Sequence, residues 1–229
     1  MIEFVDDDER KAIKQKYLTV FQKLLDSYGR ATWRQHLPAV DELVSTILSQ
    51  STSDINRDKG FNALKSRFPE WESVMNAPVG DVIDTIRPAG LANQKGPRIQ
   101  AALLYIKEQR GAMNLDFLAE MPLAEAKSWL TQMKGVGPKT AAIVLLFAFG
   151  RPVFPVDTHV FRITGRLGLI SAGVSANRAH DILEAIGDAE TFYPMHLNLI
   201  RHGREICRAR NPKCAICPLQ TDCNFFQTG

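Results

Sequence analysis

The hydrophobic residues of this chain recur at helical spacing along most of its length. Apolar side chains stand three and four positions apart in the N-terminal segment, after Pro38 and after Pro97, as in helices that bury one face. The three sets are Ile13, Tyr17, Val20, Phe21 and Leu24; Val40, Leu43, Val44, Ile47 and Leu48; and Ile99, Leu103 and Ile106. No segment alternates apolar and polar residues convincingly, as a half-buried strand would. The pattern therefore predicts an all-α protein of about ten helices.

Prolines, glycines and one aspartate indicate where these helices begin and end. Asp157 precedes "THVFRITGRLGL" and can cap that helix by accepting backbone N–H bonds. Pro88 and Gly90 interrupt the pattern and predict a short exposed loop over residues 87–96. The acidic run at residues 6–9 fits a solvated helix start, which the helix dipole favours. Proline suits the first turn of a helix, so further starts are expected at Pro38, after Gly96-Pro97, at Pro122 and at Pro194.

Composition narrows the class of protein only a little. A chain of 229 residues can hold one large domain or two small ones, and 45% apolar with 23% charged residues is ordinary for a soluble protein. No run of about 18 apolar residues occurs, which excludes a membrane span. The first residues show no signal-peptide pattern, so we expect a cytoplasmic protein. The net charge of +3 indicates nucleic acid only weakly, because such binding depends on a local patch.

All four cysteines lie close together near the C-terminus. Cys207, Cys214, Cys217 and Cys223 follow the spacing C-x6-C-x2-C-x5-C, which favours one four-thiolate site over disulfides. Zinc would accept four thiolates, but zinc ribbons favour two C-x2-C pairs and this segment has one. The spacing also differs from both common ferredoxin spacings. The residues alone therefore predict a metal or cluster site without naming the metal.

Basic residues surround the first two cysteines. Their charge fits contact with nucleic-acid phosphate beside the metal site, whereas solvated surface charge or compensation of the thiolates would be the simpler explanation. We expect some of them, Arg208 and Lys213 in particular, to contact phosphate. The full set is Arg201, Arg204, Arg208, Arg210 and Lys213.

The segment "KGVGPKT", residues 134–140, joins two predicted helices through a glycine turn. Gly135 and Gly137 flank Val136, so the backbone can turn sharply and expose N–H groups. The next helix adds the partial positive charge of its N-terminus, and together these features form a seat for phosphate. Such a seat would bind nucleic acid without reading its sequence. A plain helix–helix turn would need the glycines too.

Lys139 stands in the first turn of the following helix, where a cation is disfavoured by the dipole. The dipole and the apolar run that follows both favour the neutral amine, which is the nucleophilic form. Asp157, eighteen residues later, is expected to stay ionised at its helix start. An attacking amine and a carboxylate that deprotonates it or stabilises positive charge form a workable catalytic pair, although the spacing does not show that they meet.

The stretch "MKGVGPKTAAIVLLFAFGRPVFPVDTHVFRITGRLGL" resembles the helix-hairpin-helix and Gly/Pro…Asp motif of the endonuclease III class of DNA glycosylases, and the cysteine spacing resembles that of its [4Fe-4S] loop. The resemblance implies a two-lobed all-α protein. One lobe, residues 33–151, would be a six-helix barrel domain containing the hairpin. The other, residues 1–32 and 152–229, would hold a [4Fe-4S] cluster on the four cysteines.

The resemblance also implies roles for single residues. Lys139 matches the Schiff-base lysine, Asp157 the catalytic aspartate, and Leu91 the side chain inserted where the damaged base leaves the duplex. Gly135, Val136 and Gly137 match the hairpin that holds DNA phosphate. Core burial would be the commoner fate of a leucine, but the predicted loop makes exposure of Leu91 reasonable.

Two departures from the family pattern concern contacts with DNA. The family places a glutamine opposite the orphaned base after Ser-Ala, but "ILSQSTSD" puts Ser51 there and Gln50 one residue earlier. On a helix, which turns about 100° per residue, both could not face the duplex in the same way. In the hairpin, Met133-Lys134 replaces Leu-Pro and Pro138 replaces a basic residue.

The leading hypothesis is a bifunctional base excision repair enzyme, a DNA glycosylase and AP lyase acting on oxidised pyrimidines in duplex DNA. A second hypothesis keeps the fold but has a monofunctional enzyme for mismatched thymine or uracil that uses water; Lys139 argues against it. A third is a non-catalytic DNA-binding protein with a metal site. We expect a monomer whose partner is duplex DNA with damaged bases or abasic sites, and no membrane.

Overall fold

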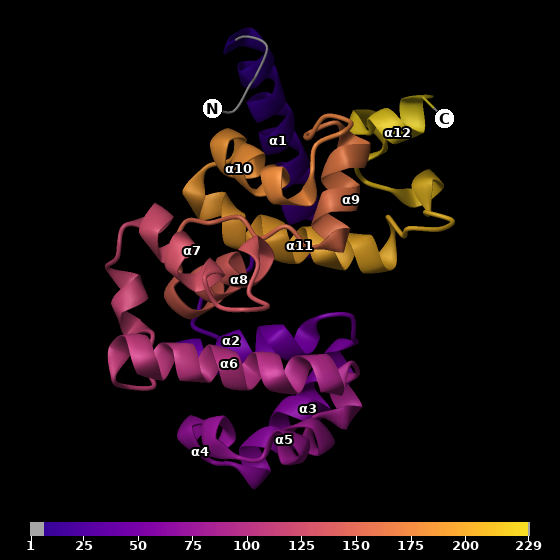
Figure 1. Ribbon diagram of the computed structural model, residues 1–229. Helices are drawn as coiled ribbons and strands as arrows, with labels where there is room; N and C mark the ends of the chain where they lie inside the picture. The colour runs from indigo at the N-terminus through magenta and orange to yellow at the C-terminus, as the bar shows by residue number, and fades with distance from the viewer. Residues whose placement is uncertain (1–6, 229) are drawn as a thin grey trace. The chain divides into compact units, whose positions relative to one another are not determined.

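The computed structural model describes residues 7–228 as an all-helical chain (Figure 1), which confirms the predicted fold class. Within these residues there are twelve α-helices, five short 3-10 helices and no strand. None of the described helices is long and apolar enough to cross a membrane. The acidic residues 7–9 lie in the first turn of the first helix as expected, whereas Asp6 lies outside the described residues.

The chain forms two compact units, one from residues 35–151 and one from both ends of the chain. The central unit contains α2 to α8. Its α-helices are α2 (Ala39–Ser49), α3 (Asp54–Arg67), α4 (Trp71–Asn76), α5 (Val79–Thr85), α6 (Ala92–Arg110), α7 (Leu123–Thr131) and α8 (Pro138–Phe149), with 3-10 helices η1 (Arg87–Ala89) and η2 (Asp116–Ala119). α2 packs against α8, α3 and α6, and as predicted the apolar helix α8 is almost entirely buried.

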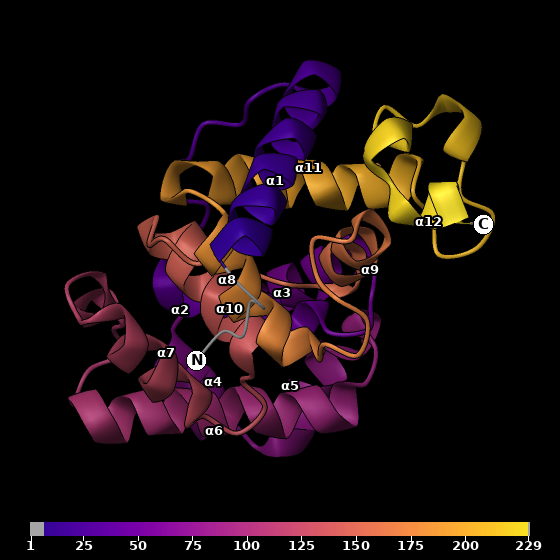
Figure 2. The same cartoon turned by 90° about the horizontal axis from the view of Figure 1, so that it is seen from above.

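The terminal unit ends at Arg34 and resumes at Pro152. In Figure 2, α1 crosses α11, and α11 leads into the yellow C-terminal segment that carries the cysteines. Tyr17, Phe154 and Leu199 belong to the core that these helices share. The α-helices are α1 (Asp7–Tyr28), α9 (Thr158–Leu167), α10 (Ala176–Ile186), α11 (Phe192–Glu205) and α12 (Asn224–Thr228), with 3-10 helices η3 (Ala189–Thr191), η4 (Cys214–Ile216) and η5 (Gln220–Asp222).

The expected start of α6 is wrong. The helix begins at Ala92, so that Pro97 lies inside it and the predicted loop shrinks to Gly90 and Leu91 after η1. Tertiary contacts outweigh the missing N–H of the proline: Lys95 is fully buried and bonded on both sides, and a Cβ on Gly96 would lie 2.8 Å from Ile83 Cγ1. α11 likewise begins earlier than expected, at Phe192, but Pro194 still falls in its first turn.

Candidate functional site

The hairpin between α7 and α8 is built as the sequence predicts, with a different reason for each glycine. Gly135 has a φ of +88°, and a Cβ there would lie 2.7 Å from Arg98 Cδ, so only glycine fits. Val136 is buried, and its N–H donates to the Met133 carbonyl at 3.0 Å. Gly137 is extended, begins α8 without a side-chain cap, and has no atom within 4 Å of an added Cβ. The open side at Gly137 leaves room for a ligand to approach the helix N-terminus.

This difference predicts opposite outcomes for two alanine substitutions. Gly135→Ala should lower the free energy of unfolding by about 1 kcal/mol or more, because the left-handed backbone and the Arg98 side chain both oppose a Cβ. Gly137→Ala should leave stability nearly unchanged but place a methyl group where a phosphate would approach. Thermal unfolding and binding of a fluorescent duplex check both; equal stability losses would contradict this account of the hairpin.

Lys139 lies in the first turn of α8, half-buried, and shares its surroundings with a carboxyl group that the sequence analysis did not identify. Glu42 on α2 is only 8% exposed and accepts a bond from Thr46 Oγ1 at 3.4 Å. Burial raises the pKa of Glu42 to about 7, against the opposing effects of the Thr46 hydroxyl and the charges of Arg57 and Lys139. The amine of Lys139 therefore has a buried acid within electrostatic reach.

Asp157 lies in the other unit, at the N-cap of α9, as predicted. Its Oδ1 accepts the Val160 N–H at 2.8 Å, and the half-buried side chain follows the buried segment 153–156. His159 of the same helix faces α11: its Nδ1 lies 3.1 Å from Arg162 Nη2, and its side chain packs closely against Gly203. Asp157 is thus held by the helix that it caps.

Leu91 is half exposed and has a φ of +50°, a strained value for a leucine. It lines a surface hollow with Arg87, Ala92, Asn93 and Gln94. Its exposure removes core burial as the explanation for this side chain. A strained, exposed leucine is typical of a position that serves a binding partner.

Gln50 and Ser51 lie beyond the end of α2, so the helical rotation assumed in the sequence analysis does not apply. Gln50 is extended, and its side chain donates to the Gly135 carbonyl at 3.2 Å and accepts from Arg98 Nη1 at 3.3 Å. Ser51 has a φ of +52° and is exposed. Gln50 therefore ties this turn to the hairpin, while Ser51 presents its side chain to solvent.

Lys95 connects the turn at Ser51 with the turn at Leu91 through its buried ammonium group. Its ammonium group donates to the carbonyls of Leu48 and Ala89, each at 2.7 Å, and burial lowers its pKa. Lys95→Met should cost about 1–3 kcal/mol, because two buried carbonyls lose their charged donor. Urea unfolding would measure the loss, and an unchanged midpoint would show that water replaces the ammonium group. Arg87→Met, on the exposed surface nearby, is the matched control.

The four cysteines line one cavity together with Arg166, Ile206 and other residues of the C-terminal segment, and none forms a disulfide. Among the residues that the structure describes, no three His, Cys, Asp or Glu side chains are close enough to hold a single metal ion. Four thiols that line one cavity supply the number and kind of ligands that an iron–sulfur cluster requires.

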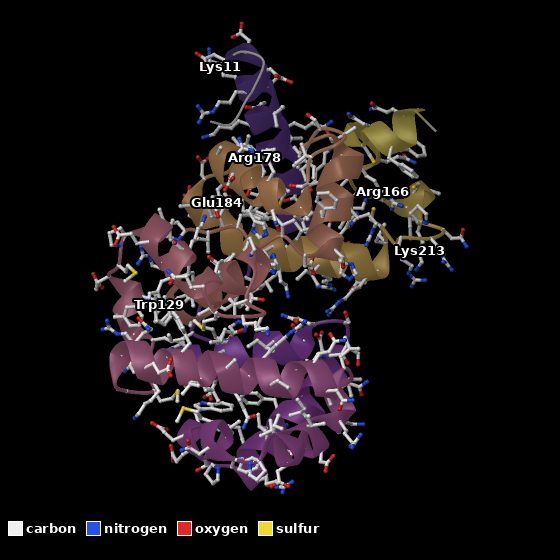
Figure 3. All side chains as sticks on the ribbon, in the orientation of Figure 1. Lys11, Trp129, Arg166, Arg178, Glu184 and Lys213 are labelled. Carbon is white, nitrogen blue, oxygen red and sulfur yellow. The ribbon has the colours of Figure 1, made fainter. Side chains whose placement is uncertain are left out.

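Arg166 and His202 support this cavity, and the sequence analysis identified neither. Arg166 Nη1 lies 3.3 Å from Cys207 Sγ and donates to the Arg208 carbonyl at 2.8 Å; Figure 3 shows Arg166 and Lys213 beside the C-terminal segment. His202 is buried, and its Nε2 lies 3.6 Å from Cys217 Sγ. Burial lowers the pKa of His202 to about 4, so the ring is neutral.

A neutral His202 has one donor nitrogen, and its neighbours decide which. Tyr28 Oη lies 2.9 Å from Nδ1. A tyrosine hydroxyl that donates to Nδ1 leaves Nε2–H to donate to the Cys217 sulfur, as hydrogen bonds to cluster sulfurs do. A histidine so close in sequence to Cys207 is the signal that could have predicted this contact. Arg208 and Lys213 are exposed beside the same cavity.

Comparisons with known proteins cover most of the chain. Residues 44–187 match the HhH-GPD superfamily of base excision DNA repair proteins, and residues 207–223 match the iron–sulfur binding domain of endonuclease III. The chain is 32% identical over 187 residues to endonuclease III of Sulfolobus acidocaldarius, an alignment that spans 80% of this chain and 81% of the archaeal protein. It is 35% identical over 190 residues to an Arabidopsis thaliana protein named as a candidate DNA glycosylase, with 79% of this chain aligned but only 64% of the plant protein.

Solved structures of endonuclease III have a fold similar to that of this chain. A non-covalent endonuclease III–DNA complex superimposes with a TM-score of 0.79 at 26% identity, and the match covers 94% of this chain and 97% of that one. A trapped covalent endonuclease III–DNA intermediate matches with a TM-score of 0.80, the same identity and the same coverage. A thermostable thymine-DNA glycosylase at 19% identity shares the fold, with a TM-score of 0.78.

Proposed function

The chain belongs to the HhH-GPD superfamily of base excision DNA repair proteins, and from this premise we propose that it removes oxidised pyrimidines from duplex DNA and cuts the strand through a Schiff base on Lys139. It is a DNA glycosylase with AP lyase activity that carries a [4Fe-4S] cluster. The observation that carries the lyase assignment is the lysine in the first turn of α8, directly after the hairpin. The related covalent endonuclease III–DNA intermediate supports it.

The reaction must begin by extruding the damaged nucleotide, since a base inside a duplex exposes no path to its sugar carbon. In our proposal the hairpin of Gly135, Val136 and Gly137 holds a DNA phosphate through the backbone N–H groups of its two glycines, because the Val136 N–H already donates to the Met133 carbonyl. Leu91 fills the space left in the stack, which offsets the lost stacking energy. Ser51, rather than the already bonded Gln50, faces the base left unpaired on the opposite strand.

Bond breaking then proceeds through the amine. The lone pair of Lys139 Nζ attacks C1′, the bond from C1′ to the base breaks, and the departing base takes a proton from the nitrogen that has just bonded to C1′. Opening of the sugar ring gives an imine between Nζ and C1′. Loss of a proton from C2′ then expels the 3′ phosphate by β-elimination and cuts the strand. Asp157 stabilises positive charge on the sugar while the base departs.

The cluster, when bound, supplies a fixed centre for the C-terminal segment and no bond-breaking chemistry in this proposal. Cys207, Cys214, Cys217 and Cys223 would hold it, with Arg166 and His202 beside the sulfurs. Arg208 and Lys213 on the same segment are proposed to contact phosphate, because they are exposed and basic. We further propose that the protein acts as a monomer in the cytoplasm.

Strand cutting and borohydride trapping test this function together. The purified brown protein should nick duplexes that contain an oxidised pyrimidine or an abasic site, and sodium borohydride should capture a covalent adduct with both. Uracil and mismatched thymine duplexes serve as comparison substrates. Free base without nicking or adduct would favour the monofunctional enzyme, and binding alone would favour the non-catalytic protein.

A further inference from the structure

Glu42 is an unusual residue to find inside the central unit. α2 is buried over most of its length, and Glu42 lies within it at 8% exposure. Glutamates are almost never this buried unless a basic partner bonds them directly. Its carboxylate accepts a long hydrogen bond from the Thr46 hydroxyl, one turn along the same helix. Glu42 thus carries a desolvation cost that the fold alone does not require.

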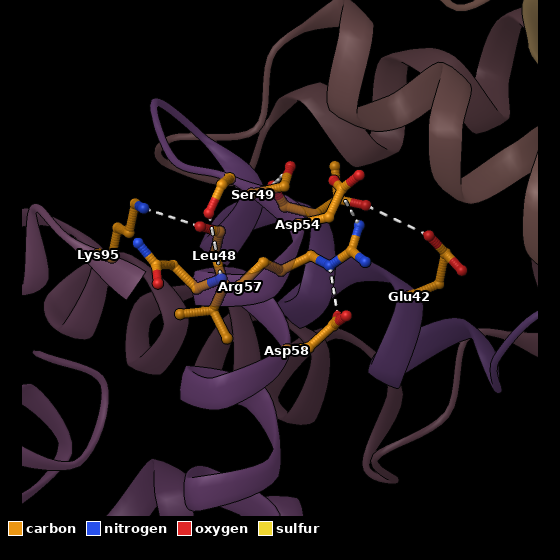
Figure 4. A network of polar contacts seen from close by, with 10 residues as sticks. Glu42, Leu48, Ser49, Asp54, Arg57, Asp58 and Lys95 are labelled. Carbon is orange, nitrogen blue, oxygen red and sulfur yellow. Dashed lines mark hydrogen bonds and ion pairs between the residues drawn. The ribbon is translucent and has the colours of Figure 1, made fainter. Parts of the chain in front are cut away.

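The charged groups around Glu42 come from two neighbouring helices. Arg57 on α3 acts on it, but the Arg57 guanidinium already bonds Asp58 at 2.8 Å and Asp54 at 3.3 Å (Figure 4). Lys139 on α8 is the second cation. From α6, Lys95 and Arg98 are bonded near the far end of α2, to the Leu48 carbonyl and to Gln50 respectively. Of the two cations that act on Glu42, only the Lys139 ammonium group can give up a proton, because an arginine guanidinium stays protonated in proteins.

We propose that Glu42 is a positioning residue for the lyase reaction, which holds Lys139 at the start of α8 and takes up its proton. This inference rests on the proposed role of Lys139 as nucleophile. In the step, the Lys139 ammonium ion gives one proton to the Glu42 carboxylate, which yields a neutral amine and a neutral carboxylic acid. No bond to carbon changes, and the lone pair on Nζ becomes free to attack C1′.

The surroundings of Glu42 suit it to this exchange. A group that gains and loses protons at neutral pH exchanges them best when its own pKa lies near the working pH. Burial places Glu42 there, with its pKa at about 7. α2 and α8 pack closely against each other, so the two helices that carry Glu42 and Lys139 are neighbours in the fold.

A permanent counter-ion would have the opposite effect on the amine. A Glu42 that only neutralised Lys139 would stabilise the ammonium form, and removing it would make the amine more reactive. A Glu42 that accepts the proton speeds the reaction, and removing it would slow the reaction. The sign of the change in rate therefore separates the two roles.

Single-turnover trapping on an abasic duplex, with enzyme in excess and pH varied from 6 to 10, measures this sign. Glu42→Gln should slow adduct formation at pH 7 by on the order of 100-fold, with the difference shrinking towards pH 10 as the amine loses its proton unaided. Glu42→Asp should recover part of the rate. Glu125→Gln, at an exposed carboxylate of the same unit, is the matched control and should follow the parent at every pH.

Three outcomes would be distinguishable. A Glu42→Gln enzyme as fast as the parent at pH 7, or faster, overturns the inference. A rate lowered equally at every pH also overturns it, because such a loss reflects altered structure. A parent that gives no adduct overturns the proposed function instead and is visible before any variant is made.

The pH dependence of the stability of Glu42→Gln, compared with that of the parent, provides a second test of the inference. The folded pKa of Glu42 is raised above its unfolded value, so the folded state holds the proton more tightly and loses stability as pH rises from about 4.5 to about 7. Glu42→Gln carries no such charge. It should unfold at a higher temperature than the parent at pH 8, and the difference should shrink towards pH 5. A less stable variant at pH 8 would contradict the buried, proton-holding carboxyl group.

Discussion

Lys139→Gln will abolish the borohydride-trapped adduct and lower strand cutting by on the order of 1,000-fold or more, while binding of an uncleavable abasic duplex stays within a few fold of the parent. The amide of glutamine has no lone pair able to form an imine with C1′. Its length is similar to that of lysine, and Lys139 is half-buried at the start of a well-packed helix, so the fold should be retained. Trapping gels, nicking assays and binding titrations measure the three quantities.

Lys134→Gln is the matched control for this result. It removes the same charge from the same hairpin, at an exposed position outside the first turn of α8. With saturating DNA it should form adduct at the parental rate. An adduct that survives in Lys139→Gln but disappears in Lys134→Gln would move the nucleophile to the neighbouring lysine and refute the assignment.

Local chemistry explains what could be predicted from the sequence. Helical periodicity and the proline and glycine signals of helix ends are properties of short segments. The all-α class, the buried helix α8 and the Asp157 cap can therefore be predicted without tertiary information. The φ of Gly135 follows from the hairpin itself. Four cysteines in one short segment likewise indicate a shared site, and the cavity they line agrees.

Tertiary packing determines what the sequence did not reveal. A glutamate on a helix is normally expected to face solvent, and only the packing of α2 against α8 and α3 buries Glu42. The same is true of Lys95, whose partners Leu48 and Ala89 lie on different elements, and whose position explains why α6 begins before Pro97. His202 contacts a cysteine fifteen residues away. In each case the packing of separate elements determines the surroundings of a polar residue on a helix.

Helix-capping residues, by contrast, can be identified from the local sequence. Ser53 and Ser175 cap α3 and α10 by the same bond that Asp157 makes to α9, and all three were accessible to local reasoning about caps. What sets Asp157 apart is its charge in a helix start that follows a fully buried segment. Substitutions at the three caps can therefore separate helix capping from catalysis.

Asp157→Asn will lower the rate of base release by on the order of 100-fold or more, while changing the free energy of unfolding by less than about 1 kcal/mol. Asparagine caps a helix about as well as aspartate, so its side-chain oxygen can keep the bond to the Val160 N–H. It has no negative charge, however, and cannot stabilise a cationic sugar. Single-turnover base release and thermal unfolding measure the two effects.

Ser175→Ala gives the converse result and completes the comparison. It removes the bond from the Arg178 N–H at the start of α10, so it should cost about 1 kcal/mol of stability and leave base release per folded molecule unchanged. A loss of activity in Asp157→Asn that matched its loss of stability would reduce Asp157 to a cap like Ser175. A large loss of activity in a fully folded Asp157→Asn protein would show that the negative charge at this cap acts on the reaction, because asparagine keeps the cap and removes the charge.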